Sequence, residues 1–368
     1  MRIETKNFKK YFIVLSEFYN KGLGDEKTEG IYLDFKTGNA YVQNNSSGIC
    51  GKVKFGFELD EGDQIENFII NTRKFLNIAQ NSDFILLDND KVFHTDGSSY
   101  KLHTLIDDVP ETLSLFDQTI QFDNTIVFDS VKLEELKRAT KYLYKKLDFP
   151  YRAIYIQNGF MSALLVDQIF EAKFDCDPPC EESISIYNDF SVFINMLDDD
   201  ITLFVSENFM KLEDTNGDIS LIMPKINLLL PEIHTEKFIE QYNASQVLEF
   251  KVDELALGLA ILSPYYKNSK LKKIALIVNP DLPNKILFKF DEEGEVIERE
   301  VEYINKEEID SLTIYFDGDS LKKAIDTLGG NIIRIAINNS NSKDSSMYLK
   351  SDLNDDRKVL LSLLQNNF

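Results

Sequence analysis

Three segments of the chain place apolar residues at helical spacing, and they recur at nearly equal intervals. These segments are residues 7–19, 130–146 and 252–265. In the second segment Leu133, Leu136 and Ala139 share one helical face, because neighbours on a helix surface are three or four positions apart. The segments begin roughly 122 residues apart in both steps, which indicates a threefold internal repeat.

A second, shorter helical pattern follows in each interval. It covers residues 72–80, 188–197 and 318–328. Each pattern has a polar residue at or just before its start that can accept hydrogen bonds from the first free backbone N–H groups, as an N-cap does. The predicted caps are Thr72, Asn188 and Asp317.

Strands are predicted on both sides of each second helix, where apolar and polar residues alternate. The strands before it are expected at residues 31–34, 40–43 and 53–59, at 153–157, 162–166 and 169–174, and at 273–278, 285–290 and 296–303. After it we expect two strands joined by a turn rich in Asn, Asp, Gly and Ser, within residues 83–105, 200–223 and 331–351.

Each repeat therefore reads helix, strands, helix, strands. Two amphipathic helices packed on antiparallel sheets make a layered α+β module. The pattern predicts three such modules, at residues 1–124, 125–246 and 247–368.

The composition is that of a folded protein. Hydrophobic residues make up 43% of the 368 residues, which argues against disorder. No apolar run reaches the ~18 residues of a membrane span, and the polar first residues do not resemble a secretion signal. We therefore expect a soluble, cytoplasmic protein with no membrane partner.

The cysteines do not predict a disulfide framework or a metal site. There are three, Cys50, Cys176 and Cys180, and an odd count at low density is unlike a disulfide scaffold. Cys176 and Cys180 could form half of a metal site, but no second Cys or His pair lies nearby in the sequence. Unpaired thiols are the default interpretation, and no cofactor is expected.

Motifs for catalysis are missing from the sequence. It contains no nucleotide-binding GxxxxGK[ST] loop, no GxSxG and no HExxH. A metal-dependent nuclease would use clustered acids, but acidic runs such as residues 198–200 and 291–293 are more typical of solvated turns. We do not expect an enzyme.

The net charge of −22 argues against a protein that coats DNA, since neutralising phosphates needs a dense basic surface. A protein that encircles DNA needs only a basic lining. The most basic stretch is the helix of the second repeat, in which Lys137, Lys141 and Lys145 lie four residues apart on one stripe. This stripe is either a solvated helix face or part of a DNA-facing surface.

Several segments resemble bacterial β sliding clamps, the β subunits of DNA polymerase III. Residues 71–105 resemble a first-domain segment of that family, with its helix, hairpin and serine-rich turn. Residues 230–233 (Leu-Pro-Glu-Ile) look like the turn that ends the second domain. Residues 260–263 and 316–337 are similar to helix and strand segments of the third. The likeness extends over essentially the whole chain.

The chain departs from the family pattern at two places. The family's Ala-Thr-Asp-Gly-His-Arg-Leu-Ala strand corresponds to residues 165–172, where only Asp167 and Ala172 are kept. The family's C-terminal Met-Pro-Met/Val-Arg-Leu corresponds to residues 361–365, followed by three more residues. Both segments contribute to the family's peptide pocket, so ligand preference is expected to have drifted, as in a phage- or plasmid-encoded clamp.

The resemblance implies a homodimeric ring, with two chains head to tail, six modules and twelve helices facing the hole. Such a ring encircles duplex DNA without sequence specificity and confers processivity in DNA replication. It does so by tethering the replicative DNA polymerase, and it also binds a clamp loader and other clamp-binding peptides. The DNA-binding positions implied by the resemblance and the basic stripe are Lys9, Lys10, Arg73, Lys137, Lys141, Lys145, Arg152 and Lys322.

Two protein-binding surfaces are implied as well. The partner-peptide pocket carries over to Tyr155, Val166, Ile169, Phe170, Pro231, Ile233, Val359, Leu361 and Ser362. The dimer interface carries over to Tyr100 and Leu102 on one side and Ile261 and Leu262 on the other. For these apolar residues the alternative is packing inside a domain.

A second function fits the same resemblance. The chain could be a clamp-fold scaffold or decoy that binds replication proteins without encircling DNA. Basic residues gathered on the inner helices would favour the working clamp, and basic residues spread over the rim would favour the scaffold.

Overall fold

The computed structural model describes most of the chain in separate segments. They are residues 2–4, 30–44, 48–59, 68–71, 84–88, 91–93, 99–101, 104–105, 115–116, 120–143, 153–157, 159–165, 167–175, 184–187, 190–197, 200–225, 246–269, 272–292, 294–304, 310–337, 346–354 and 356–364. The fold is α+β, as predicted, with antiparallel sheets and few helices.

The chain forms two compact units. Unit 1 contains Met1–Lys137, Cys176–Pro178 and Asp189–Asn227, and unit 2 contains Arg138–Asp175, Pro179–Asn188 and Leu228–Phe368. The predicted module boundaries at residues 124 and 246 fall inside these units, so the division into three modules stays a prediction.

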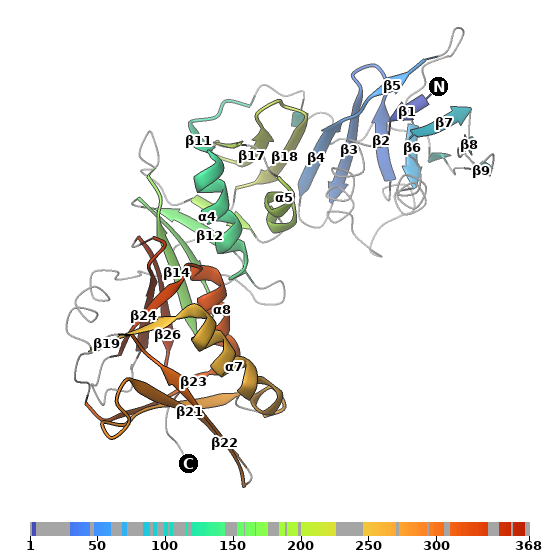
Figure 1. Cartoon of the computed structure of the whole chain (residues 1–368). Helices are drawn as coiled ribbons and strands as arrows, with labels where there is room; N and C mark the ends of the chain where they lie inside the picture. The colour runs from blue at the N-terminus through green and yellow to red at the C-terminus, as the bar shows by residue number, and fades with distance from the viewer. Residues whose placement is uncertain are drawn as a thin grey trace. The chain divides into compact units, whose positions relative to one another are not determined.

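Unit 1 contains a five-stranded sheet, β5-β1-β7-β8-β9, and a nine-stranded sheet, β10-β6-β2-β3-β4-β18-β17-β16-β11 (Figure 1). The strands that begin before residue 60 are β1 (Arg2–Glu4), β2 (Gly30–Asp34), β3 (Asn39–Asn44), β4 (Ile49–Lys54) and β5 (Phe57–Glu58). Those between residues 68 and 105 are β6 (Phe68–Asn71), β7 (Phe84–Asp88), β8 (Lys91–Phe93), β9 (Ser99–Lys101) and β10 (Thr104–Leu105). The remainder are β11 (Asn124–Phe128), β16 (Ile201–Val205), β17 (Phe209–Asp214) and β18 (Ile219–Pro224).

Two helices accompany these sheets. Helix α4 (Ser130–Thr140) begins where predicted, because Asp129 acts as its N-cap: the Asp129 carboxylate accepts a hydrogen bond of 2.9 Å from the Lys132 N–H. Helix α5 (Ser191–Met196) starts later than predicted and has Phe190 at its cap position, with no side-chain cap bond. The predicted helices at 7–19 and 72–80 lie outside the described residues, as do the predicted caps Thr72 and Asn188.

Unit 2 contains an eight-stranded sheet, β15-β12-β13-β14-β26-β25-β24-β19, and a four-stranded sheet, β22-β21-β20-β23. The strands of the first are β12 (Ala153–Gln157), β13 (Phe160–Leu164), β14 (Gln168–Lys173), β15 (Ile184–Tyr187), β19 (Gln246–Lys251), β24 (Ile332–Ile337), β25 (Ser346–Ser351) and β26 (Arg357–Ser362). Those of the second are β20 (Lys273–Val278), β21 (Lys285–Glu292), β22 (Glu295–Glu302) and β23 (Leu312–Asp317).

Helices α7 (Val252–Tyr266) and α8 (Gly318–Leu328) lie side by side in unit 2 (Figure 1). Helix α7 packs closely on the four-stranded sheet at Gly258, where an added Cβ would lie 2.7 Å from a methyl carbon of Val301. The predicted cap of α8 is confirmed: the Asp317 carboxylate accepts hydrogen bonds from the N–H groups of Asp319 and Ser320. Gly329, at φ 64°, ends this helix.

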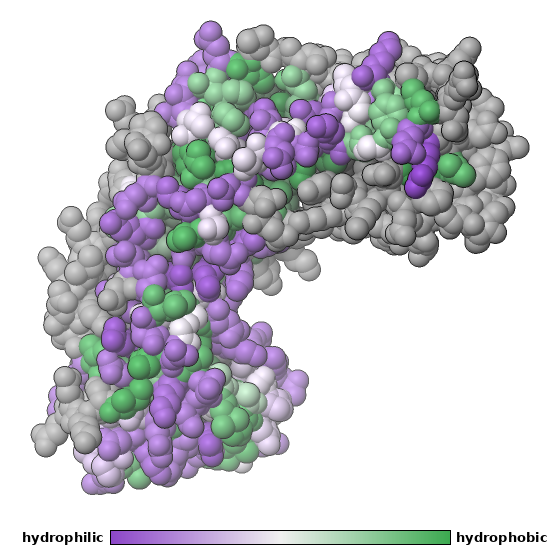
Figure 2. Space-filling view, turned by 45° about the horizontal axis from the view of Figure 1, so that its top comes forward, coloured by the Kyte–Doolittle hydropathy of each residue, from purple (hydrophilic) through white to green (hydrophobic). Residues whose placement is uncertain are grey.

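None of the described helices combines the length and the apolar character needed to cross a membrane. On the face drawn in Figure 2, hydrophobic patches alternate with hydrophilic ones over the described surface.

Candidate functional site

The two widest sheets are built in the same way, from strands that occupy the same places in the predicted sequence repeat. The three-strand sets β2-β3-β4, β12-β13-β14 and β20-β21-β22 correspond to one another, and so do β7-β8-β9, β16-β17-β18 and β24-β25-β26. The nine-stranded sheet joins β4 to β18, and the eight-stranded sheet joins β14 to β26. In both cases the third strand of a first set pairs with the third strand of a second set. We call each of these strand pairs a seam.

The seam between β14 and β26 contains much of the predicted peptide pocket. Ile169 lies opposite Leu360, and Phe170 lies opposite Val359. Because successive residues of a strand point to opposite faces, the predicted pocket residues are divided between two faces of the sheet.

Phe170, Val359 and Leu361 lie on the face that packs against helices. The ring of Phe170 stacks on Tyr142, just beyond α4, at 5.4 Å between centroids, and α8 packs on β26. The three pocket residues of this face have no exposed surface. We call it the helix face.

The other face carries Tyr155, Ile169 and Ser362, and we call it the Glu171 face. Ile169 is half-buried and Ser362 is exposed. Tyr155 is fully buried, and burial raises the pKa of its hydroxyl to about 12. Val166, Pro231 and Ile233, the remaining predicted pocket residues, lie outside the described residues.

An ion pair lies in the middle of the Glu171 face. Glu171 of β14 and Lys358 of β26 are directly opposite, and both are buried. Desolvation raises the pKa of the Glu171 carboxyl, and the hydrogen bond and charge of Lys358 oppose that shift. The Lys358 ammonium also lies 5.0 Å from the centre of the Phe160 ring. The sequence pattern missed this pair, because neither residue stands in a motif.

A buried amide lies beside the seam. Gln168, at the start of β14, is 2% exposed, and neither its amide nitrogen nor its amide oxygen makes a hydrogen bond to the described residues. Its register partner is Leu361, so it belongs to the helix face. Burying an amide without hydrogen-bond partners lowers the stability of the folded protein. Gln168 is therefore an unfavourable polar side chain in an otherwise apolar part of the seam.

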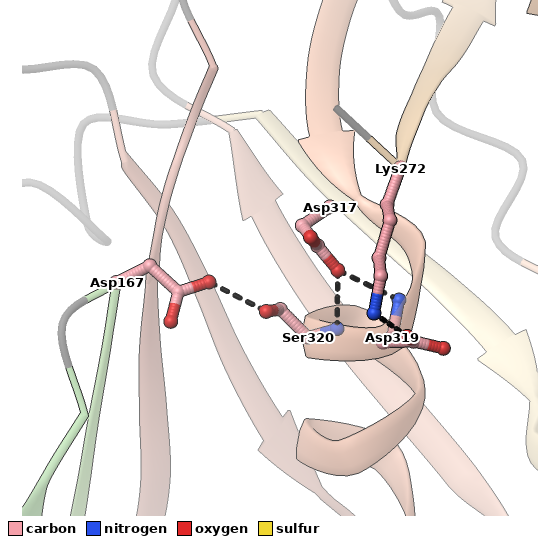
Figure 3. Close-up of polar contacts among 5 residues, drawn as sticks. All are labelled: Asp167, Lys272, Asp317, Asp319 and Ser320. Atoms are coloured by element: carbon pink, nitrogen blue, oxygen red, sulfur yellow. Dashed lines mark hydrogen bonds and ion pairs between the residues drawn. The ribbon is translucent and has the colours of Figure 1, made fainter. Parts of the chain in front are cut away.

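The turn between β13 and β14 is attached to the N-terminal turn of α8. The Asp167 carboxylate accepts a hydrogen bond of 2.5 Å from the Ser320 hydroxyl, and Figure 3 shows the two side chains pointing toward each other. Beside them, the Lys272 ammonium bonds the Asp319 carboxylate at 2.6 Å. The Asp167 carbonyl also accepts a bond of 2.8 Å from the Ser362 N–H, so one turn contacts both α8 and β26.

The basic residues of α4 have different environments. Lys137 is half-buried and forms an ion pair with Glu134 at 3.2 Å. Arg138 donates a hydrogen bond of 3.0 Å to the Thr327 carbonyl, so it holds the C-terminal end of α8. Lys141, just after α4, is exposed.

Basic residues are sparse on the other described helices. Lys322 of α8 is exposed, whereas Lys323 lies 5.4 Å from the centre of the Tyr142 ring, and burial lowers its pKa. Helix α7 contains no basic residue. The other predicted DNA-binding positions, Lys9, Lys10, Arg73, Lys145 and Arg152, lie outside the described residues.

Helix α7 instead exposes an apolar stripe. Leu257, Ile261 and Tyr265, spaced four residues apart, are 48%, 38% and 39% exposed. The adjacent Leu262 has no exposed surface and belongs to the core. Of the other predicted interface residues, Tyr100 is in β9, and Leu102 lies outside the described residues.

The described residues contain no cluster of three or more His, Cys, Asp or Glu that could hold a metal ion. Cys50 is buried, and desolvation raises the pKa of its thiol to about 12, so it is not poised as a nucleophile. Cys176 and Cys180 lie outside the described residues.

Comparison of the structure with solved structures identifies the fold. The DNA polymerase III beta subunit from Thermotoga maritima matches with a TM-score of 0.80 at 13% identity, over 100% of this chain and 99% of that one. The DNA polymerase sliding clamp from Bacillus subtilis matches with a TM-score of 0.78 at 11% identity, over 100% and 99%. The DNA polymerase III subunit beta from Pseudomonas aeruginosa matches with a TM-score of 0.76 at 14% identity, over 99% of both chains.

The sequence itself matches no protein-family model and no curated protein. The structural likeness covers the full length of the chain, and the chain has the fold of these sliding clamps.

Proposed function

We propose that this chain, which has the fold of the bacterial β sliding clamps, works as a sliding clamp. Two copies join head to tail in a ring that encircles duplex DNA without sequence preference and tethers the replicative DNA polymerase. A clamp loader and other partners would bind the same protein. The closed ring would then stay on DNA because of its topology and would need little affinity for DNA. Such retention is compatible with a net charge of −22.

The observation that carries this proposal is the repeated seam. Within the chain, β4 pairs with β18 and β14 pairs with β26. The corresponding strands that are left over are β22 and β9, and each is the outermost strand of its sheet in the described part of the chain. Pairing β22 of one copy with β9 of a second copy repeats the same seam and removes both free edges. Applied at both ends of two chains, this pairing closes a ring.

The sequences of these two edges contain opposite charges and apolar residues. The strand β22 carries Glu298, Glu300 and Glu302, and Lys91 and Lys101 are register partners at the β8–β9 edge. The apolar stripe of α7 lies next to β22, since α7 packs on that strand. Stable interfaces favour such an apolar core with a charged rim. Ile261 is thus the proposed α7 contact, with Tyr100 and Leu102 on the partner.

Lys141 and Lys322 are the proposed DNA-facing residues in the described part of the chain, because both are exposed, Lys141 directly after α4 and Lys322 on α8. Lys137 contributes less, since Glu134 partly neutralises it. The remaining predicted DNA contacts, Lys9, Lys10, Arg73, Lys145 and Arg152, are proposed on the resemblance alone.

The Glu171 face of the β14–β26 seam is the proposed docking face for partner peptides. Ile169 and Leu360 are half-buried and directly opposite each other, so their side chains offer an apolar contact for a peptide anchor. The fully buried Phe170, Val359 and Leu361 would support this contact from the helix face.

A clamp-fold scaffold that does not encircle DNA is the second candidate. The exposed face of α7 favours it, because this face is apolar and α7 contains no basic residue. The two candidates differ in whether the protein is held on closed DNA circles.

A crosslinked ring on DNA tests the proposal. Cysteines at Glu300 and Lys101, with Cys176 and Cys180 replaced by serine, would be joined across the proposed seam by a bis-maleimide linker in the presence of a nicked circular plasmid. We expect a crosslinked dimer that stays on the circle during gel filtration and slides off after the plasmid is cut. Equal retention on circular and linear DNA, or no crosslinked dimer, would contradict the proposal.

A further inference from the structure

The seam between β4 and β18 has one segment of the chain attached on both of its sides. The segment begins at Phe116, which is half-buried and lies on the β4 side. Its ring centre is 5.7 Å from that of Tyr41 in β3 and 5.8 Å from the ammonium of Lys52 in β4. Tyr41 and Lys52 are register partners, so Phe116 contacts two neighbouring strands at one point of the sheet.

The segment ends on the β18 side of the seam. The ring centre of Phe122 is 5.4 Å from that of Phe204 in β16. Directly after Phe122, the Asp123 N–H donates a hydrogen bond of 2.8 Å to the Val205 carbonyl, and β11 then pairs with β16. Backbone hydrogen bonds therefore fix this end of the segment in addition to the ring contact.

Both ends lie on the same face of the sheet. A row of register partners crosses the seam from Lys52 and continues through Ser220, Glu213 and Thr202. Directly opposite residues of antiparallel strands point to the same face. Phe204 is two positions after Thr202 in β16 and therefore points to that face as well.

The segment is long enough to cross the seam but has little length to spare. The sheet order β4-β18-β17-β16 puts three strand spacings, about 14 Å, between the strands that its two ends contact (Figure 1). The six residue steps from Phe116 to Phe122 extend over at most roughly 20 Å. Residues 117–119 of the segment lie outside the described residues. A connection of this length limits how far β4 can move from β18 while both ends stay attached.

We infer that the segment from Phe116 to Phe122 is a strap that opposes opening of the β4–β18 seam. To separate, the two strands must break their backbone hydrogen bonds and also detach the weaker end of the strap, which is Phe116. Its aromatic contact and its cation–π contact each change an equilibrium constant by a factor of a few. Together they should lower the population of the open seam about tenfold.

The inference concerns a single chain and goes beyond the proposed function. If two copies form the proposed ring, the β4–β18 seam is reinforced by the strap, whereas the seam between copies has no covalent connection. The ring would then deform less at the joint inside the chain.

A second interpretation is that Phe116 only packs on the sheet, as other apolar residues do. The two interpretations differ in the effect of the length of the segment. A lengthened strap no longer opposes opening, although Phe116 keeps its contacts, because the longer connection follows the moving strands without detaching. A packing contact does not depend on the length of the connection.

Hydrogen exchange of single backbone amides in β4 measures opening of the seam. The Lys54 N–H donates a hydrogen bond of 2.7 Å to the Asp218 carbonyl across the seam, whereas the Phe55 N–H donates to the Gly38 carbonyl on the other side of β4. Successive residues of a strand bond opposite neighbours, so the even-numbered amides of β4 bond β18 and the odd-numbered amides bond β3. The strand thus contains its own reference.

Three variants of the full-length chain test the inference against the wild type by mass spectrometry with electron-transfer fragmentation. They are Phe116→Ala, insertion of about twelve Gly and Ser residues between Ile120 and Gln121, and both changes together. We expect each single change to speed exchange of the even-numbered amides about tenfold, and the combination to speed it no further. Exchange of the odd-numbered amides should not change.

Two controls match these changes. Phe160→Ala removes another half-buried ring beside a lysine, since the Lys358 ammonium lies 5.0 Å from the Phe160 ring centre. The same linker inserted between Pro280 and Asp281, both exposed, lengthens a connection in unit 2. Neither control should change exchange of the even-numbered amides of β4, and circular dichroism checks that every variant folds.

Three results would overturn the inference. If the insertion leaves exchange unchanged, or if the two effects multiply, Phe116 acts by packing alone. If the odd-numbered amides exchange faster by the same factor, opening is not confined to the seam. The measurement needs neither DNA nor a second copy, so any of these results would leave the proposed clamp untouched.

Discussion

Ser320 donates a hydrogen bond of 2.5 Å to the carboxylate of Asp167, a residue 153 positions earlier in the chain. The bond attaches the turn before β14 to the first turn of α8. Asp317 accepts hydrogen bonds from the N–H groups of Asp319 and Ser320 in the same turn. The start of one helix therefore depends on a turn from a distant part of the sequence.

Replacing Ser320 with Ala removes that bond and leaves the partly buried Asp167 carboxylate with one fewer donor. We expect the free energy of unfolding to fall by about 1.5–3 kcal/mol, the range for hydrogen bonds to charged groups. Urea unfolding followed by circular dichroism measures the change. Ser311→Ala, at an exposed position, is the matched control and should have almost no effect. An equal loss for both variants would mean that the bond contributes nothing specific.

The Glu171–Lys358 pair predicts opposite outcomes for single and double substitutions. Glu171→Leu leaves the Lys358 ammonium buried without its partner and should cost about 3–5 kcal/mol. Glu171→Leu combined with Lys358→Met replaces the pair by apolar side chains and should restore wild-type stability or exceed it. A double variant no more stable than the single one would contradict this account.

The same pair gives a pH dependence with a defined sign. The pKa of Glu171 is raised in the folded protein, so on titration with base the unfolded chain loses this proton first. This group therefore lowers stability as pH rises from its ordinary pKa of 4.5 toward the raised value, and it has no further effect above that value. Subtracting the unfolding curves of Glu171→Gln from those of the wild type between these pH values should reveal this loss. A difference that does not change with pH would argue against a raised pKa.

Adjacent residues of α7 should respond differently to the same substitution. Ile261→Asp places a charge on the exposed stripe and should yield folded monomers, if α7 contacts a second copy as proposed. Leu262→Asp buries a charge in the core and should prevent folding. Light scattering and circular dichroism distinguish the two results. A dimer that persists in Ile261→Asp at low concentration would remove this part of α7 from the interface.

Charge reversal at Lys141 and Lys322 should weaken the affinity of the chain for a short linear DNA duplex and leave folding intact, since both side chains are exposed. Lys54→Glu with Lys36→Glu, two exposed positions away from the helices, makes the same charge change and is the control. The loss should grow as salt is lowered, because screening hides the difference at high salt. Equal affinity of the two double variants for the duplex would mean that these residues do not face DNA.

Helix positions could be predicted from the sequence where amphipathic spacing and a capping residue coincide. The predicted helix at 318–328 agrees with α8, and the one at 252–265 agrees with α7 to within one residue. The predicted helix at 188–197 is shorter in the structure, where α5 begins at Ser191 without a side-chain cap. Strand positions could likewise be predicted from the alternation of apolar and polar residues.

The pairing of distant strands could not be predicted from local pattern. The Glu171–Lys358 pair exists because β14 and β26 are neighbours in the sheet, although they are far apart in the chain. The alternation of side chains along β14 places Ile169 and Phe170 on opposite faces of the sheet, but it does not show which face packs against helices. Likewise, helical spacing alone did not distinguish the exposed Ile261 from the buried Leu262.

The position of β26 between β14 and β25 has a consequence for biosynthesis. While the chain is being translated, β12, β13 and β14 leave the ribosome long before residues 357–362 exist, so the edge of β14 that later bonds β26 is unpaired during that time. Such an edge is a template for wrong pairing, and the late, non-local closure slows folding. We therefore expect the nascent chain to be most prone to aggregation, and to gain most from chaperones, before β26 has been made.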